Sequence, residues 1–100
     1  MANDFEITQM DKIDQLKEQG RAYLRSNQAD MAIRVFAKVL ELDADDLDSL
    51  LVLGDSYLLI GDRNASLTFY LQAWRLAPDR RDVQRRVDLA LTRSTEEDQA

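Results

Sequence analysis

The feature of this sequence that most restricts its fold is an internal repeat with a period of 34 residues. Large apolar and small side chains return in the same order one period apart. The later copy contains Leu50, Leu53, Gly54, Tyr57, Gly61, Ser66, Tyr70, Ala73 and Pro78. The earlier copy contains Leu16, Gly20, Tyr23, Asn27, Ala32, Phe36, Val39 and Ala44. One period later only a single apolar face remains, so we expect two repeated units and one further element.

Within each copy the apolar residues recur at steps of three and four, which is the spacing of an amphipathic helix. Strand patterns are absent from the sequence. The spacing predicts five helices, over residues 9–26, 28–42, 46–60, 63–76 and 80–94. The sequence therefore predicts an all-α fold.

The residues between these helices predict how each helix ends and the next begins. Asn27 and Gly61 lie one period apart, and both residue types tolerate the left-handed backbone that closes many helices. Asp45 and Asp62 are expected to cap the helices that follow them, and Thr8 the first helix. We therefore expect the same turn geometry in both units.

Small residues at equivalent places indicate that the helices form close pairs. Gly20 and Gly54 would allow two helix backbones to approach, facing Ala32 and Ser66 of the partner helix. A bulky side chain at such a crossing would push the two axes apart. The expected unit is an antiparallel helix hairpin.

This pattern resembles the tetratricopeptide repeat family. The residues that carry the resemblance are Leu50, Leu53, Gly54, Tyr57, Ser66, Tyr70 and Pro78. The resemblance implies antiparallel hairpins stacked as a short right-handed solenoid of five helices. It places repeat one at 13–46, repeat two at 47–80 and a capping helix at 80–94 of a single domain over 9–94. Residues 1–8 are then an N-terminal arm, and 95–100 a disordered tail.

Composition excludes several function classes. The chain has no cysteine and no histidine, which removes the commonest metal ligands and the commonest general base, so we expect no enzyme activity, metal or cofactor. A run of aspartates from Asp43 to Asp48 could hold calcium, but helix capping explains it better. The net charge of −6 disfavours nucleic acid. No stretch suits membrane insertion or a signal peptide, so a cytoplasmic protein is expected.

The resemblance implies that the first helix of each pair lines a concave groove that binds a protein or peptide ligand. The groove positions taken as partner-binding are Lys17, Arg21, Leu24, Arg25, Leu51, Asp55, Leu58, Leu59, Arg85 and Leu89. Leu51, Leu58 and Leu59 would form an apolar centre that suits an amphipathic helix or extended peptide. The alternative is that Leu58 and Leu59 pack against neighbouring helices or the N-terminal arm.

The expected function is a non-catalytic protein-binding adaptor, assembly factor or small chaperone. The family includes modules that clamp the terminal carboxylate of heat-shock proteins, but Arg21 and Leu51 or Val52 stand where that clamp needs asparagines. One alternative is a chaperone similar to those of bacterial type III secretion. Another is a homo-oligomer formed by repeat stacking, to which the apolar residues of the arm, Phe5, Ile7 and Met10, would contribute.

Overall fold

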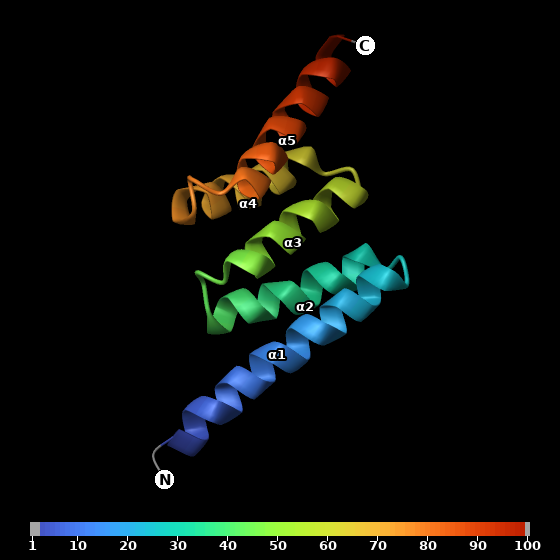
Figure 1. Cartoon of the computed structure of the whole chain (residues 1–100). Coiled ribbons are helices and arrows are strands. Elements are labelled where there is room, and N and C mark those ends of the chain that lie inside the picture. The colour runs from blue at the N-terminus through green and yellow to red at the C-terminus, as the bar shows by residue number, and fades with distance from the viewer. Residues whose placement is uncertain (1–2, 100) are drawn as a thin grey trace.

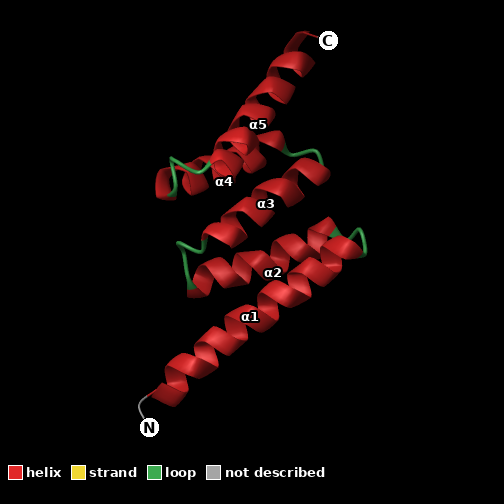
Figure 2. Ribbon diagram, in the orientation of Figure 1, coloured by secondary structure: helices red, strands yellow, loops and turns green. Residues whose placement is uncertain are grey.

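The computed structural model folds the chain into five consecutive α-helices (Figures 1 and 2). It describes the backbone of residues 3–99 and the side chains of residues 10–92. In chain order the helices are α1 (Asn3–Arg25), α2 (Ala29–Leu42), α3 (Leu47–Leu59), α4 (Arg63–Leu76) and α5 (Arg81–Gln99). No strand occurs between residues 3 and 99, so the prediction of an all-α fold is confirmed.

The helices stack in the order of the chain. Each helix packs on the next one, and Figure 1 shows α1, α3 and α5 running in one direction with α2 and α4 running in the other. The result is an elongated body with extents of 59 × 31 × 18 Å. This arrangement of antiparallel hairpins is a short helical solenoid, as predicted.

Both hairpin turns close in the same way. Asn27 and Gly61 have φ angles of 62° and 89°, which lie in the left-handed region. The N–H of the residue after each of them donates to the carbonyl five residues earlier, at 2.8 Å after α1 and at 2.9 Å after α3. This hydrogen bond satisfies a carbonyl that the end of a helix would otherwise leave free. The prediction of one turn geometry used twice is confirmed.

Aspartates cap the helices that follow two of the turns. The Asp46 carboxylate accepts the N–H of Ser49 at 3.2 Å, and the Asp62 carboxylate accepts the N–H of Ala65 at 3.1 Å. The expectation that Asp45 would cap α3 is wrong by one residue. In a run of neighbouring aspartates several residues can cap, and the position of the first helical turn decides which one does.

The hairpins close over two glycines, each covered by an aromatic ring. A Cβ atom at Gly20 would overlap the ring of Phe36, and one at Gly54 would overlap the ring of Tyr70. The rings therefore occupy the space that a larger residue would need. The small residues that were expected to face the glycines are also fully buried: Ala32 and Ser66.

The interior consists of two apolar clusters that share α3. The first joins α1, α2 and α3. Its buried members are Ala32, Phe36, Val39 and Leu53, and residues of α1 such as Leu16 and Leu24 pack against them. The second joins α3, α4 and α5, and its buried members are Leu50, Leu51, Tyr70, Ala73, Val83 and Ala90. Helix α3 contributes buried residues to both clusters. It therefore links the hairpin of α1 and α2 to α4 and α5.

Both ends of the chain are more helical than the sequence analysis expected. The first helix begins at Asn3, so it includes most of the expected arm and places Thr8 inside the helix. The last helix continues through residues 95–99, where a disordered tail was expected. Extending an existing helix by one residue costs much less than starting one, and glutamate and glutamine are good helix formers.

Candidate functional site

The surface to which α1, α3 and α5 contribute side chains carries the residues that were expected to bind a partner. We call it the first-helix face, because α1 and α3 each open a hairpin and α5 follows in the same orientation (Figure 1). Successive positions on one side of a helix are three or four residues apart. The expected residues follow that spacing from Lys17 to Arg25, from Leu51 to Leu59 and from Arg85 to Leu89.

The charged residues at the start of this face neutralise one another. The Lys17 ammonium lies 3.1 Å from the Asp46 carboxylate and 3.3 Å from that of Asp48, and only 16% of the Lys17 side chain is exposed. Arg21 forms an ion pair with the same Asp48. Two cations therefore meet two anions between α1 and the start of α3, which leaves little net charge for a ligand.

The pKa values of Lys17 and Asp46 are shifted by burial and by the contacts of each group. Burial lowers the pKa of Lys17, but the hydrogen bond and charge of Asp46, helped by Asp48, outweigh burial, so the pKa of Lys17 is raised overall. Burial likewise raises the pKa of Asp46, while hydrogen bonds from Ser49 and Lys17 outweigh that effect and lower the pKa below its ordinary value. Both shifts favour the charged forms, so the pair contributes to stability.

Asp55 joins three helices and is also occupied. Arg86 binds its carboxylate with two hydrogen bonds, from Nε at 2.9 Å and from Nη2 at 3.1 Å, and the Tyr70 hydroxyl donates to the same carboxylate. The hydrogen bond to Asp55 raises the pKa of Arg86 despite burial, and burial together with Asp55 raises the pKa of Tyr70. Asp55 thus fixes α5 against α3 and α4.

The leucines of the face differ in their exposure. Leu51 is 6% exposed and belongs to the core cluster with Val83 and Ala90, so the expectation that it would contact a ligand is wrong. Buried residues of both α4 and α5 belong to the cluster that contains it. Leu58 is partly buried against the same cluster. Leu59, in contrast, is 69% exposed, and Leu89 on α5 is 47% exposed.

The remaining expected residues lie nearer the ends of the face. Leu24 is partly buried against the first core cluster. Arg25 is exposed and its guanidinium lies 3.0 Å from the Glu18 carboxylate. Arg85 is exposed and forms no ion pair within the described part of the chain.

Of the residues expected to support self-association, only one has a described side chain. Met10 is 65% exposed on α1. Phe5 and Ile7 lie in the same helix, but their side chains fall outside the described residues. Among these residues, exposure to solvent is therefore established for Met10 alone, the one whose side chain is described.

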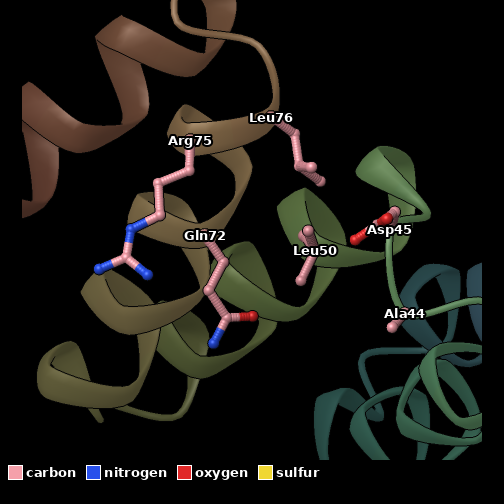
Figure 3. Close-up of a pocket in the computed structure, with 6 residues that line it drawn as sticks. All are labelled: Ala44, Asp45, Leu50, Gln72, Arg75 and Leu76. Carbon is pink, nitrogen blue, oxygen red and sulfur yellow. The ribbon is translucent and has the colours of Figure 1, made fainter.

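Among the described residues, three shallow clefts border α4. The one in Figure 3 has a volume of about 200 Å³ and lies between the α2–α3 turn and the end of α4. Leu50 and Leu76 form its apolar wall, and Asp45 and Arg75 lie on opposite sides. Another, of about 260 Å³, lies between α4 and α5, and a third, of about 160 Å³, lies on α4 alone. All are small for an enclosed ligand site.

Among the described residues, no group of acidic side chains is arranged to hold a metal ion. The aspartates near α3 instead cap that helix and pair with Lys17 and Arg21. None of the described helices combines the length and the apolar composition that crossing a membrane requires.

The stacked helices and the equivalent glycine–aromatic contact in each hairpin define an α-helical repeat protein of the solenoid class. Comparison with protein families gives two matches to the tetratricopeptide repeat, over residues 15–50 and 49–84. The chain belongs to the tetratricopeptide repeat family, as its sequence pattern indicated. These repeats generally mediate protein–protein interaction, and the family is typically non-catalytic. A comparison with curated proteins finds no match.

Three residues that shape the first-helix face were missing from the sequence-based prediction: Asp46, Tyr70 and Arg86. Each is the partner of a residue that was predicted. Opposite charges on consecutive first helices are the sequence signal that could have identified the Asp55–Arg86 pair. The Lys17–Asp46 pair has a similar signal, since Asp46 immediately precedes α3.

Proposed function

We propose that this protein is a non-catalytic adaptor, assembly factor or small chaperone that binds an apolar segment of a partner protein on its first-helix face. Membership of the tetratricopeptide repeat family supports the general role. The single observation that carries the specific proposal is the 69% exposure of Leu59 on α3. Leu59 is a solvent-exposed leucine at a position that faces the ligand in this family. Such exposure supports a role for Leu59 in contacting a partner, not in packing the core.

The second exposed leucine supports the same surface. Leu89 lies on α5, the next first helix after α3, and is 47% exposed. Leu24 and Leu58 are partly exposed on the same helices as Arg25 and Leu59. An amphipathic helix or an extended peptide of the partner would cover these apolar side chains with its own.

The ion pairs of the face support an apolar ligand over a carboxylate clamp. Lys17, Arg21 and Asp55 all have partners within the protein, so a ligand that used them would first have to break those pairs. When a ligand draws one residue out of a partly buried ion pair, the charge of the other residue is left without a partner. Arg85 is the basic side chain of the expected set that has no such partner among the described residues, and an acidic group beside the ligand's apolar residues would complement it.

The experiment is affinity capture from a lysate of the source cell, followed by peptide mapping of the captured protein. The test variant is Leu59→Glu combined with Leu89→Glu. A hot-spot residue of an interface contributes about 2 kcal/mol or more, and about 1.4 kcal/mol corresponds to a factor of ten in binding. We therefore expect at least a roughly tenfold loss of capture.

The matched control is Leu76→Glu, which makes the same change at a leucine that is 45% exposed at the end of α4. Capture by this variant should equal that of the natural protein, and all variants should keep their helical circular dichroism. Undiminished capture by the Leu59/Leu89 variant would refute the assignment of the face.

A further inference from the structure

One of the three clefts lies between α4 and α5, at the α5 end of the stack (Figure 1). We call it the α4–α5 cleft. It has a volume of about 260 Å³, and the described residues that line it are Trp74 of α4 and Gln84, Val87 and Asp88 of α5. None of the four is among the residues expected to bind a partner on the first-helix face. The cleft is therefore a separate surface.

The repeat explains why this cleft is open. Asp88 lies one repeat period after Gly54, and Trp74 lies one period after Leu40. In the earlier unit, the Tyr70 ring of α4 covers Gly54, and Leu40 packs against both core clusters. Within the described residues no further helix follows α5. The α4–α5 cleft thus lies where the second helix of a hairpin would cover Asp88 and Trp74.

Exposure to water accounts for two of the lining residues but not for Trp74. Gln84 and Asp88 replace Leu50 and Gly54 of the earlier unit, and polar side chains suit the outer face of a terminal unit. Trp74, however, is 44% exposed beside them and is the only tryptophan of the chain. Tryptophan is enriched among the residues that dominate binding energy in protein interfaces. Its exposure indicates that a partner side chain covers the indole ring.

The polar groups of the cleft favour a cation as that partner group. Asp88 is exposed, forms no ion pair within the described part of the chain, and is the only charged residue among the described residues that line the cleft. The Gln84 amide nitrogen donates to the carbonyl of Pro78 at 2.8 Å, which leaves its amide oxygen as an acceptor. A carboxylate, an amide oxygen and an indole ring all attract positive charge. The net charge of −6 also favours the approach of a basic segment.

Arginine suits these groups better than lysine does. Its planar guanidinium stacks on aromatic rings and has five N–H donors, two of which can bind one carboxylate in parallel. The cleft is smaller than the pockets that enclose whole small molecules, so a single side chain is the expected occupant. Leu71 and Leu91 lie one turn from the lining residues on the same side of α4 and α5, and they are 39% and 48% exposed. Apolar residues beside the arginine would contact them.

We propose that the α4–α5 cleft binds an arginine side chain within a short apolar segment of a partner protein, with the guanidinium against the Trp74 indole and paired with the Asp88 carboxylate. The Gln84 amide oxygen accepts a further N–H of the same guanidinium. This contact is additional to the one proposed at Leu59, and it does not depend on it.

Fluorescence titration of the natural protein with a synthetic peptide tests the proposal. The probe is acetyl-Ala-Leu-Arg-Leu-Ala-amide, and the control peptide has citrulline, which has nearly the same shape but no charge, in place of arginine. Trp74 reports directly because it is the only tryptophan. The arginine peptide should change its emission to saturation. The citrulline peptide should bind roughly tenfold more weakly, since a hydrogen bond between two charged groups is lost.

Three variants locate the site. Asp88→Asn should abolish the preference for arginine over citrulline, because asparagine has a similar shape without the charge. The matched control is Asp30→Asn, which removes one charge at an exposed residue of α2 and should keep the full preference. Trp74→Leu, followed by calorimetry, should bind the arginine peptide roughly two- to fivefold more weakly, the effect of losing an exposed cation–π contact.

Equal binding of the two peptides by the natural protein would overturn the proposal, and this comparison requires no variant to fold. An arginine preference that persists in Asp88→Asn would also overturn it, as would a lack of binding by either method up to millimolar peptide. If a second copy of the chain fills the cleft instead, sedimentation equilibrium without peptide would give a mass above 11.5 kDa and Trp74 emission would shift to the blue, which would overturn it too. Loss of partner capture by the Leu59/Leu89 variant has no bearing on these results, since neither leucine lines the cleft.

Discussion

At the scale of single residues, the fold depends on contacts between a glycine of one helix and an aromatic ring of the next. The rings of Phe36 and Tyr70 are fully buried over Gly20 and Gly54, one contact in each hairpin. Close packing of this kind leaves no room for even one additional methyl group. These contacts set the distance between the helices, and with it which other side chains remain exposed.

Gly54→Ala is therefore expected to lower the free energy of unfolding by about 1–3 kcal/mol, since its methyl group would overlap the Tyr70 ring. Helix propensity alone would produce the opposite result, a gain of about 1 kcal/mol. Urea unfolding followed by circular dichroism distinguishes the two effects. Combining Gly54→Ala with Tyr70→Leu provides the control, because a smaller side chain opposite the alanine should recover part of the loss. A gain in stability from Gly54→Ala alone would contradict the packing.

At the scale of helices, Asp46 performs two functions at the start of α3. It caps the helix through the N–H of Ser49, and it holds Lys17 of α1 at 3.1 Å. The same residue thereby ties the first hairpin to the second. Because its pKa is lowered in the folded state, the stabilisation is present above the ordinary carboxyl pKa and is lost as the pH falls through the lowered value.

Asp46→Asn should keep the cap and remove the charge, because asparagine is as good a cap as aspartate. We expect the free energy of unfolding to fall by about 1 kcal/mol at neutral pH, the upper end for a pair of this type. The difference from the natural protein should close as the pH falls through the lowered pKa of Asp46. Asp62, which caps α4 in the same way, is the control, and Asp62→Asn should change stability less. A difference that stays constant down to acidic pH would contradict the ion pair.

Sequence reasoning succeeded for the elements because their signals are local or recur at a fixed period. Asn27 and Gly61 each determine a turn by their own backbone preference. The glycines at the hairpin crossings, Gly20 and Gly54, lie one repeat apart. The ends of α1 and α5 were less predictable. No proline or glycine marks the beginning of α1 at Asn3 or the end of α5 at Gln99. Without such a residue, adding one more residue to an existing helix costs little free energy.

At the scale of the whole molecule, the stack decides which leucines a partner could reach. Leu51 and Leu59 are on the same helix and both were expected to contact a ligand, yet only Leu51 belongs to the core cluster that joins α3 to α4 and α5. Two members of that cluster, Val83 and Ala90, lie more than thirty residues further along the chain than Leu51. The spacing within α3 therefore could not distinguish the two leucines.

Photo-crosslinking from position 59 tests the central claim most directly. A photoreactive amino acid replaces Leu59 in one chain and Leu76, which is exposed on α4, in another, and both chains are irradiated with the captured partner. We predict a covalent product with the partner from position 59 and none from position 76. A product from position 76 with none from position 59 would contradict the assignment of partner binding to the first-helix face.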